Sequence, residues 1–163
     1  MRLFCEAIVV LAVNTAVLRK FCVSSRSITS LIFVSTAKPG MNQDDFLAIM
    51  SVTLRNSERF GLTGLLVCNG FNFMQYIEGE RSSVRDRMYY IGQDDRHSGV
   101  TILYQQESES RQFANIYFAG RHFPSIQGCA QSDLPKILAD VSMPEMARTL
   151  FRSFGSLGLQ PSG

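Results

Sequence analysis

The side chains that could do chemistry are few and form no familiar catalytic set. The chain has four cysteines and two histidines, without the C-x-x-C spacing of a zinc or dithiol site. Cys129 and His122 could act as nucleophile and base, but no third residue is placed to orient the base. The loop at residues 37–40 lacks the glycines and the arginine of a phosphate-binding loop. We therefore expect reduced thiols, no metal and no enzymatic activity.

One polar run, at residues 94–97, follows directly on a predicted helix. In one interpretation it is a solvated helix end, where Arg96 and His97 complement the negative end of the helix dipole. In the other it is the polar edge of a binding site that also includes Asp94. Both alternatives stay open on the spacing alone.

Composition places the chain among ordinary globular proteins. Its 163 residues amount to one domain, and 45% hydrophobic residues suffice for a core without disulfides or metals. The net charge of +2 is spread along the chain, so a basic nucleic-acid surface is not indicated. Together with the unpaired cysteines, this favours a cytoplasmic protein.

The first 27 residues do not fit the pattern of the rest. Residues 7–18 are mostly apolar, but a membrane span takes about 20 residues. Glu6, the basic pair Arg19-Lys20 and the lack of an A-x-A-like site argue against a secretory signal. We expect a docking helix here, a frayed segment, or a start codon assigned too far upstream.

From residue 28 onward, strands and helices alternate. Residues 30–36 are β-branched and apolar, which predicts a buried strand. Asn42 has the character of an N-cap, and Gly61 is placed to end the helix that follows. The helix has one apolar face, made of Phe46, Ile49, Met50, Thr53 and Leu54.

The remaining elements complete an α+β arrangement. Asn69-Gly70 predicts a hairpin between strands at residues 62–68 and 72–77, with Glu78-Gly79 closing the second strand. A helix at 83–93 and strands at 100–105 and 114–119 follow. The order β-α-β-β-α-β, plus one strand, predicts a ferredoxin-like sheet with two helices on one face.

Two short helices are expected after Pro124, at residues 132–141 and 143–154. The second has an apolar stripe, which serves either the core or a protein partner (Met143, Met146, Leu150, Phe151 and Phe154). We divide the chain into an extension at 1–27, a domain at 28–122, and a helical cap with a frayed tail at 123–163.

The chain resembles the BLUF family of blue-light sensors that use flavin. The resemblance lies in ordered blocks: LIFVSTA at 31–37, GLTGLLV at 61–67, FMQYIEG at 73–79, IGQDDRH at 91–97 and RQFA at 111–114. It implies the ferredoxin-like fold, with FAD held between the two helices above the sheet. It also implies a sensory function exerted through a protein partner or a homo-oligomer, without direct contact with nucleic acid or membrane.

The resemblance also implies a set of flavin-contacting residues. The apolar walls match Ile49, Leu66, Phe73 and Ile91, and the glutamine beside the flavin matches Gln75. Residues near the ring edge or the ribityl chain match Asn56, Asp94, Arg96 and His97, and two further family positions fall on Phe33 and Ser57.

Several of these positions depart from the family. Phe33 stands where the family has a tyrosine that passes an electron and a proton to the excited flavin, and Ser57 stands where it has an asparagine. Ile116 and Phe118 replace a common tryptophan and methionine on the last strand. We expect a flavin-binding domain whose photocycle is impaired or lost. The alternatives are a flavin-free interaction module, whose contact surface is the stripe at 143–154 with the last strand, and, less favoured by the loop at 37–40, an acylphosphatase-like enzyme.

Overall fold

The computed structural model of the chain describes residues 27–69, 71–120 and 133–156. Its elements are β1 (Ile28–Ala37), α2 (Gln43–Phe60), β2 (Thr63–Cys68), β3 (Asn72–Glu80), α3 (Arg81–Gly92), β4 (His97–Ser108), β5 (Ile116–Gly120), α4 (Asp133–Asp140) and α5 (Glu145–Ser156). The predicted order of strands and helices is confirmed. The N-terminal extension up to residue 26 lies outside the described residues.

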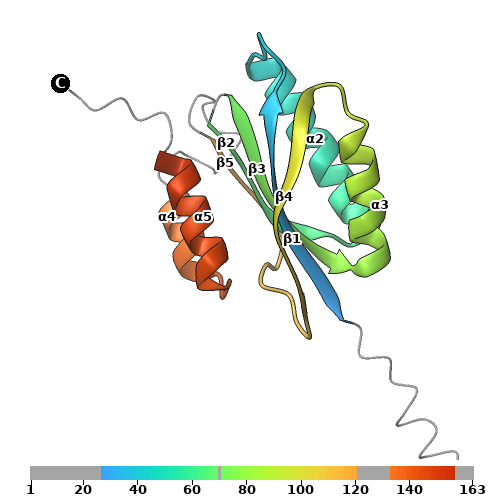
Figure 1. Cartoon of the computed structure of the whole chain (residues 1–163), viewed down its shortest axis with the longest axis vertical. Coiled ribbons are helices and arrows are strands. Elements are labelled where there is room, and N and C mark those ends of the chain that lie inside the picture. Colours follow the sequence, from blue (N-terminus) through green and yellow to red (C-terminus); the bar gives the residue numbers. More distant parts are fainter. Residues whose placement is uncertain (1–26, 70, 121–132, 157–163) are drawn as a thin grey trace, which may run out of the picture.

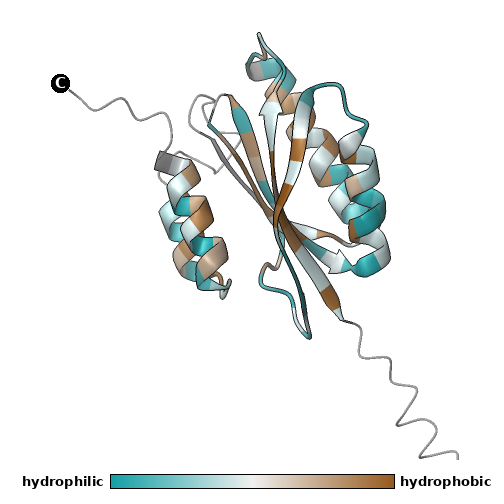
Figure 2. Ribbon diagram, viewed as in Figure 1, coloured by the Kyte–Doolittle hydropathy of each residue, from teal (hydrophilic) through white to brown (hydrophobic). Residues whose placement is uncertain are grey.

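The five strands form one sheet in the order β4-β1-β3-β2-β5. Neighbouring strands are antiparallel except β2 and β5, which are parallel. Helices α2 and α3 cover one face of the sheet, and α4 and α5 cover the other (Figure 1). Hydrophobic residues follow the strands, whereas the outer side of α3 is hydrophilic (Figure 2). The ferredoxin-like α+β prediction is confirmed, and the C-terminal helices add a third layer.

Helix α2 begins and ends where the sequence predicts. The Asn42 side chain accepts a hydrogen bond from the backbone N–H of Asp45 at 3.0 Å, and the Asp45 carboxylate accepts one from the N–H of Asn42 at 3.0 Å. Gly61 ends the helix with a φ of 60°, which favours glycine. The predicted apolar face is wrong at Leu54, which is 48% exposed at an open groove between α2 and β5.

Strand β3 does not end at Ile77 as predicted, but continues to Glu80. Glu78 stays in the strand because its buried carboxylate accepts backbone N–H bonds from Gln112 at 2.9 Å and Phe113 at 2.7 Å. These bonds tie the chain before β5 to the middle of the sheet. The next residue in the strand is glycine because a Cβ at position 79 would lie 2.7 Å from the Leu62 side chain.

The C-terminal helices bury their apolar stripe against the sheet. Phe151, Phe154 and Met143 are buried in one cluster with Ile32 and Tyr76, on the face opposite α2 and α3. The core-packing alternative is confirmed for these three residues, and their use as an exposed contact surface is wrong. Met146 remains 63% exposed.

Truncation of the stripe tests this packing. We expect Phe151→Ala to lower the free energy of unfolding by about 3–5 kcal/mol, because it leaves a cavity in a fully buried site. Met146→Ala on the same helix is expected to change it by less than about 0.5 kcal/mol, since Met146 is exposed. Urea denaturation of both variants measures the difference, and equal effects would place α5 off the sheet.

Candidate functional site

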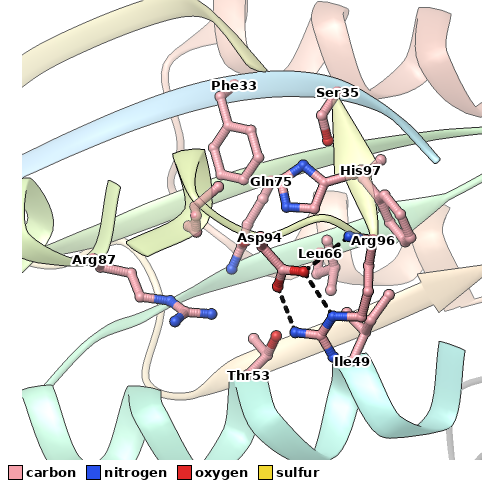
Figure 3. A pocket seen from close by; sticks show the side chains of 12 residues that line it. Phe33, Ser35, Ile49, Thr53, Leu66, Gln75, Arg87, Asp94, Arg96 and His97 are labelled. Atoms are coloured by element: carbon pink, nitrogen blue, oxygen red, sulfur yellow. Dashed lines mark hydrogen bonds and ion pairs between the residues drawn. The ribbon is translucent and has the colours of Figure 1, made fainter. Parts of the chain in front are cut away.

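A cavity of about 30 Å³ lies above the sheet, with residues from both α2 and α3 in its wall (Figure 3). Its lining combines apolar side chains with amide, hydroxyl, imidazole, carboxylate and guanidinium groups. The residues are Phe33, Ser35, Ile49, Thr53, Leu66, Phe73, Gln75, Arg87, Ile91, Asp94, Arg96 and His97.

The sheet forms the floor of this cavity through its strand register. Pairing of β1 with β3 sets Phe33 opposite Gln75, and pairing of β2 with β3 sets Leu66 opposite Gln75. The three side chains therefore form one row across the central strands. Ser35, two residues after Phe33 on β1, lies on the same face of the sheet.

Each helix contributes an apolar residue and a polar one, four positions apart. Ile49 and Thr53 come from α2, and Arg87 and Ile91 come from α3. Residues four apart lie on the same side of a helix, so each pair faces the sheet together. Phe73 of β3 stacks on Phe46, with ring centroids 6.2 Å apart, which fixes the orientation of its ring.

The turn between α3 and β4 carries a closed ion pair. The Arg96 side chain donates to Asp94 through Nε at 2.8 Å and through a second guanidinium nitrogen, and the Arg96 backbone N–H also donates to Asp94 at 3.1 Å. Hydrogen bonding from Arg96 lowers the pKa of Asp94 and outweighs the opposing effect of burial. Burial lowers the pKa of His97, so its imidazole is neutral at neutral pH.

Two buried polar atoms of the cavity have no hydrogen-bond partner among the described residues. Ser35 Oγ and His97 Nδ1 are buried and unpaired. The Gln75 side chain is 5% exposed, and no hydrogen bond joins its amide to another of the side chains drawn in Figure 3. A buried unpaired polar group costs about 1–3 kcal/mol. An occupant with donors and acceptors on its edge would recover that free energy.

The lining matches a flat ring with apolar faces and a polar edge in chemistry, but not yet in size. About 30 Å³ is room for two or three water molecules, at about 10–15 Å³ each, and a tricyclic ring needs more room than this.

The structure brings nine of the eleven predicted site residues to this cavity: Phe33, Ile49, Leu66, Phe73, Gln75, Ile91, Asp94, Arg96 and His97. Their contact with a flavin stays a prediction. Asn56 and Ser57 do not line it; Ser57 is buried one turn beyond Thr53, at the groove between α2 and β5. Ile116 lies at the same groove. The Phe118 side chain is outside the described part of the chain.

Three lining residues were missed in the sequence: Ser35, Thr53 and Arg87. Strand alternation from Phe33 would have found Ser35, and the helical spacing between Arg87 and Ile91 would have found Arg87. Thr53 was assigned to the apolar helix face without a role in the site.

Fold and cavity together define a small α+β domain with a small cavity of mixed polar and apolar lining between a helix pair and a sheet. The chain belongs to the BLUF family, "Sensors of blue-light using FAD", whose sequence profile matches residues 28–119.

Relatives of known name agree with this assignment. Photoactivated adenylate cyclase subunit beta of Euglena gracilis is 34% identical over 86 residues, which cover 52% of this chain and 10% of that protein. BlrP1 of Klebsiella pneumoniae, in a structure with FMN and cyclic diGMP, is 25% identical with a TM-score of 0.65, covering 80% of this chain and 35% of that one. BlrB, a BLUF protein in its dark state, is 25% identical with a TM-score of 0.59. The match covers 80% of this chain and 97% of that one. The chain thus spans about a tenth of the length of the curated relatives.

Within residues 27–69, 71–120 and 133–156, no three His, Cys, Asp or Glu side chains gather as a metal site, and no helix is long and apolar enough to cross a bilayer. Cys68 is buried. His122 and Cys129, the candidate nucleophile pair, lie outside the described residues.

The ion pair makes stability depend on pH. The pKa of Asp94 is lower in the folded state than in the unfolded state. The ionised carboxylate therefore stabilises the fold fully at a pH above its unfolded pKa of about 4, and this stabilisation is lost as the pH falls through its folded pKa. We expect the stability difference between wild type and Asp94→Asn to be largest near neutral pH and to shrink on acidification. Urea denaturation across this range measures it. Asp95→Asn, at an exposed neighbour, is the control, and a pH-independent difference would contradict the assignment.

Proposed function

We propose that the chain is an FAD-binding regulatory domain whose light response is impaired or lost. One observation supports this above the others: Phe33 lies opposite Gln75 at the cavity, where the family resemblance expects the photoactive tyrosine. A phenyl ring has no hydroxyl, so it can neither release a proton nor donate a hydrogen bond to Gln75. Among the described residues that line the cavity, none is a tyrosine, tryptophan or cysteine that could replace it.

The remaining residues are suited to hold the ring without that phenol. Ile49, Leu66, Phe73 and Ile91 offer apolar surface to its faces. Gln75, with an amide that both donates and accepts, and the unpaired Ser35 and His97 atoms offer partners to its polar edge. When bound, the flavin supplies absorption of blue light; the side chains position it and exclude water.

A flavin-free interaction module is the second candidate, and the small volume of the cavity favours it. Strands β4 and β5 are the two edges of the sheet, and β4 exposes Ile102 and Leu103. An edge strand with exposed apolar side chains suits contact with another protein or a second copy of this chain. The cyclase activity named for the Euglena relatives belongs to proteins of which this chain matches about a tenth.

Absorption spectra of freshly purified protein, in the dark and under blue light, separate the candidates. We expect a flavin spectrum that does not change on illumination, because Phe33 supplies no proton or electron. Phe33→Tyr restores the lost phenol opposite Gln75, and we expect this variant to gain a reversible red shift. Phe60→Tyr, a partly buried position outside the cavity, is the control for an added phenol.

Each contrary outcome identifies the part that is wrong. A reversible shift in the wild type would contradict the loss of photochemistry. Colourless protein that takes up no added FAD would contradict flavin binding and leave the interaction module, which sedimentation as an oligomer or a stable complex would then support.

A further inference from the structure

Arg87 is a charged residue on the buried side of α3. It lies three positions after Val84 and four before Ile91, and both of these are buried against the sheet. Its guanidinium extends from the helix toward Asp94 and Gln75 in the wall of the cavity (Figure 3). Arg87 is partly buried, which is unusual for a charged residue that has no ion-pair partner among the described residues.

The guanidinium of Arg87 has no counter-ion within the described part of the chain. Asp94 is the acidic group that raises the pKa of Arg87, but both of its carboxylate oxygens already accept hydrogen bonds from Arg96. Burial lowers the pKa of Arg87, with Asp94 opposing that shift and Arg96 adding to it. Arginine stays protonated in proteins, so the cavity wall holds a cation whose desolvation is not repaid.

The other groups around the cavity do not cancel this charge. Asp94 and Arg96 neutralise each other, and His97 is neutral at neutral pH because burial lowers its pKa. Ser35 adds an unpaired hydroxyl, and the Gln75 amide in the same lining can also donate hydrogen bonds. The lining is therefore positive by one charge and rich in donors, which favours an occupant that carries negative charge.

We propose that Arg87 makes this cavity hold a reduced, negatively charged flavin more tightly than an oxidised, neutral ring. The inference rests on the proposed binding of FAD. Taking up two electrons and one proton from a donor such as a reduced pyridine nucleotide would add one negative charge to the ring, and the positive charge of Arg87 in the lining would attract it. Tighter binding of the reduced form raises the reduction potential by linkage. The domain would then report the redox state of the bound cofactor, a function that needs no phenol at Phe33.

The reduction potential of bound FAD tests the role of Arg87. Anaerobic titration with dithionite is followed by the flavin absorbance, in wild type, Arg87→Met, Arg87→Lys and Arg85→Met. We expect Arg87→Met to weaken the preference for reduced over oxidised FAD at least tenfold. For a two-electron couple this lowers the reduction potential by about 30 mV. Arg87→Lys keeps the charge and stays near the wild type. Arg85→Met removes the same charge from an exposed position on α3, paired with Asp86, and leaves the potential unchanged.

The affinity for oxidised FAD is measured beside the potential, so the two proposals fail separately. If Arg87→Met and Arg85→Met bind FAD and have equal potentials, the role of Arg87 is wrong while the flavin proposal stands. If the wild type takes up no FAD, the proposed function is wrong and this inference fails with it. A potential restored by Arg87→Lys excludes a merely structural effect of the methionine.

Discussion

The antiparallel pairing of β1 with β3 determines what this protein can do. The register sets Phe33 opposite Gln75, and β2 on the other side of β3 sets Leu66 opposite the same residue. A slip of β3 by one residue would send Gln75 to the opposite face, against α4 and α5 and away from Phe33 and Leu66. Glu78 and Arg111 resist such a slip: the Glu78 carboxylate accepts the N–H of Phe113 at 2.7 Å, and Arg111 donates to the Glu78 carbonyl at 3.0 Å. The strand register of the sheet therefore determines which side chains form the floor of the cavity.

The two faces of the sheet differ in their packing: one is closed by a single apolar cluster, and the other holds the cavity. On the α4 and α5 face, one apolar cluster is closed, and Phe151 is fully buried within it. On the other face, two smaller clusters lie under α2 and α3, with the cavity between them and buried polar atoms of Ser35 and His97 unpaired. Buried polar atoms without a hydrogen-bond partner among the described residues occur on both faces: those of Ser35 and His97 lie at the cavity, and those of Ser30 and Tyr76 lie on the packed face.

Sequence reasoning predicted the elements because their signals are local. The Asn42 cap, the Gly61 stop and strand alternation depend on neighbouring residues. It failed at Glu78-Gly79, because a turn-like pair stays in β3 only through contacts with Gln112, Phe113 and Leu62 elsewhere in the chain. The family resemblance identified nine of the lining residues. It also placed Ser57 at this site, whereas Ser57 lies at the groove between α2 and β5. Arg87 was overlooked, because a charged side chain is expected at an exposed position.

Quenching of flavin fluorescence tests the central claim most directly. The chain contains no tryptophan, and no described residue of the cavity lining carries a phenol, so an excited ring there has no electron donor beside it. The account predicts that bound flavin keeps a long excited-state lifetime in the wild type, and that Phe33→Tyr shortens it. Equally fast quenching in the wild type and in Phe33→Tyr would show that another donor serves the ring, and would contradict the loss of photochemistry at Phe33.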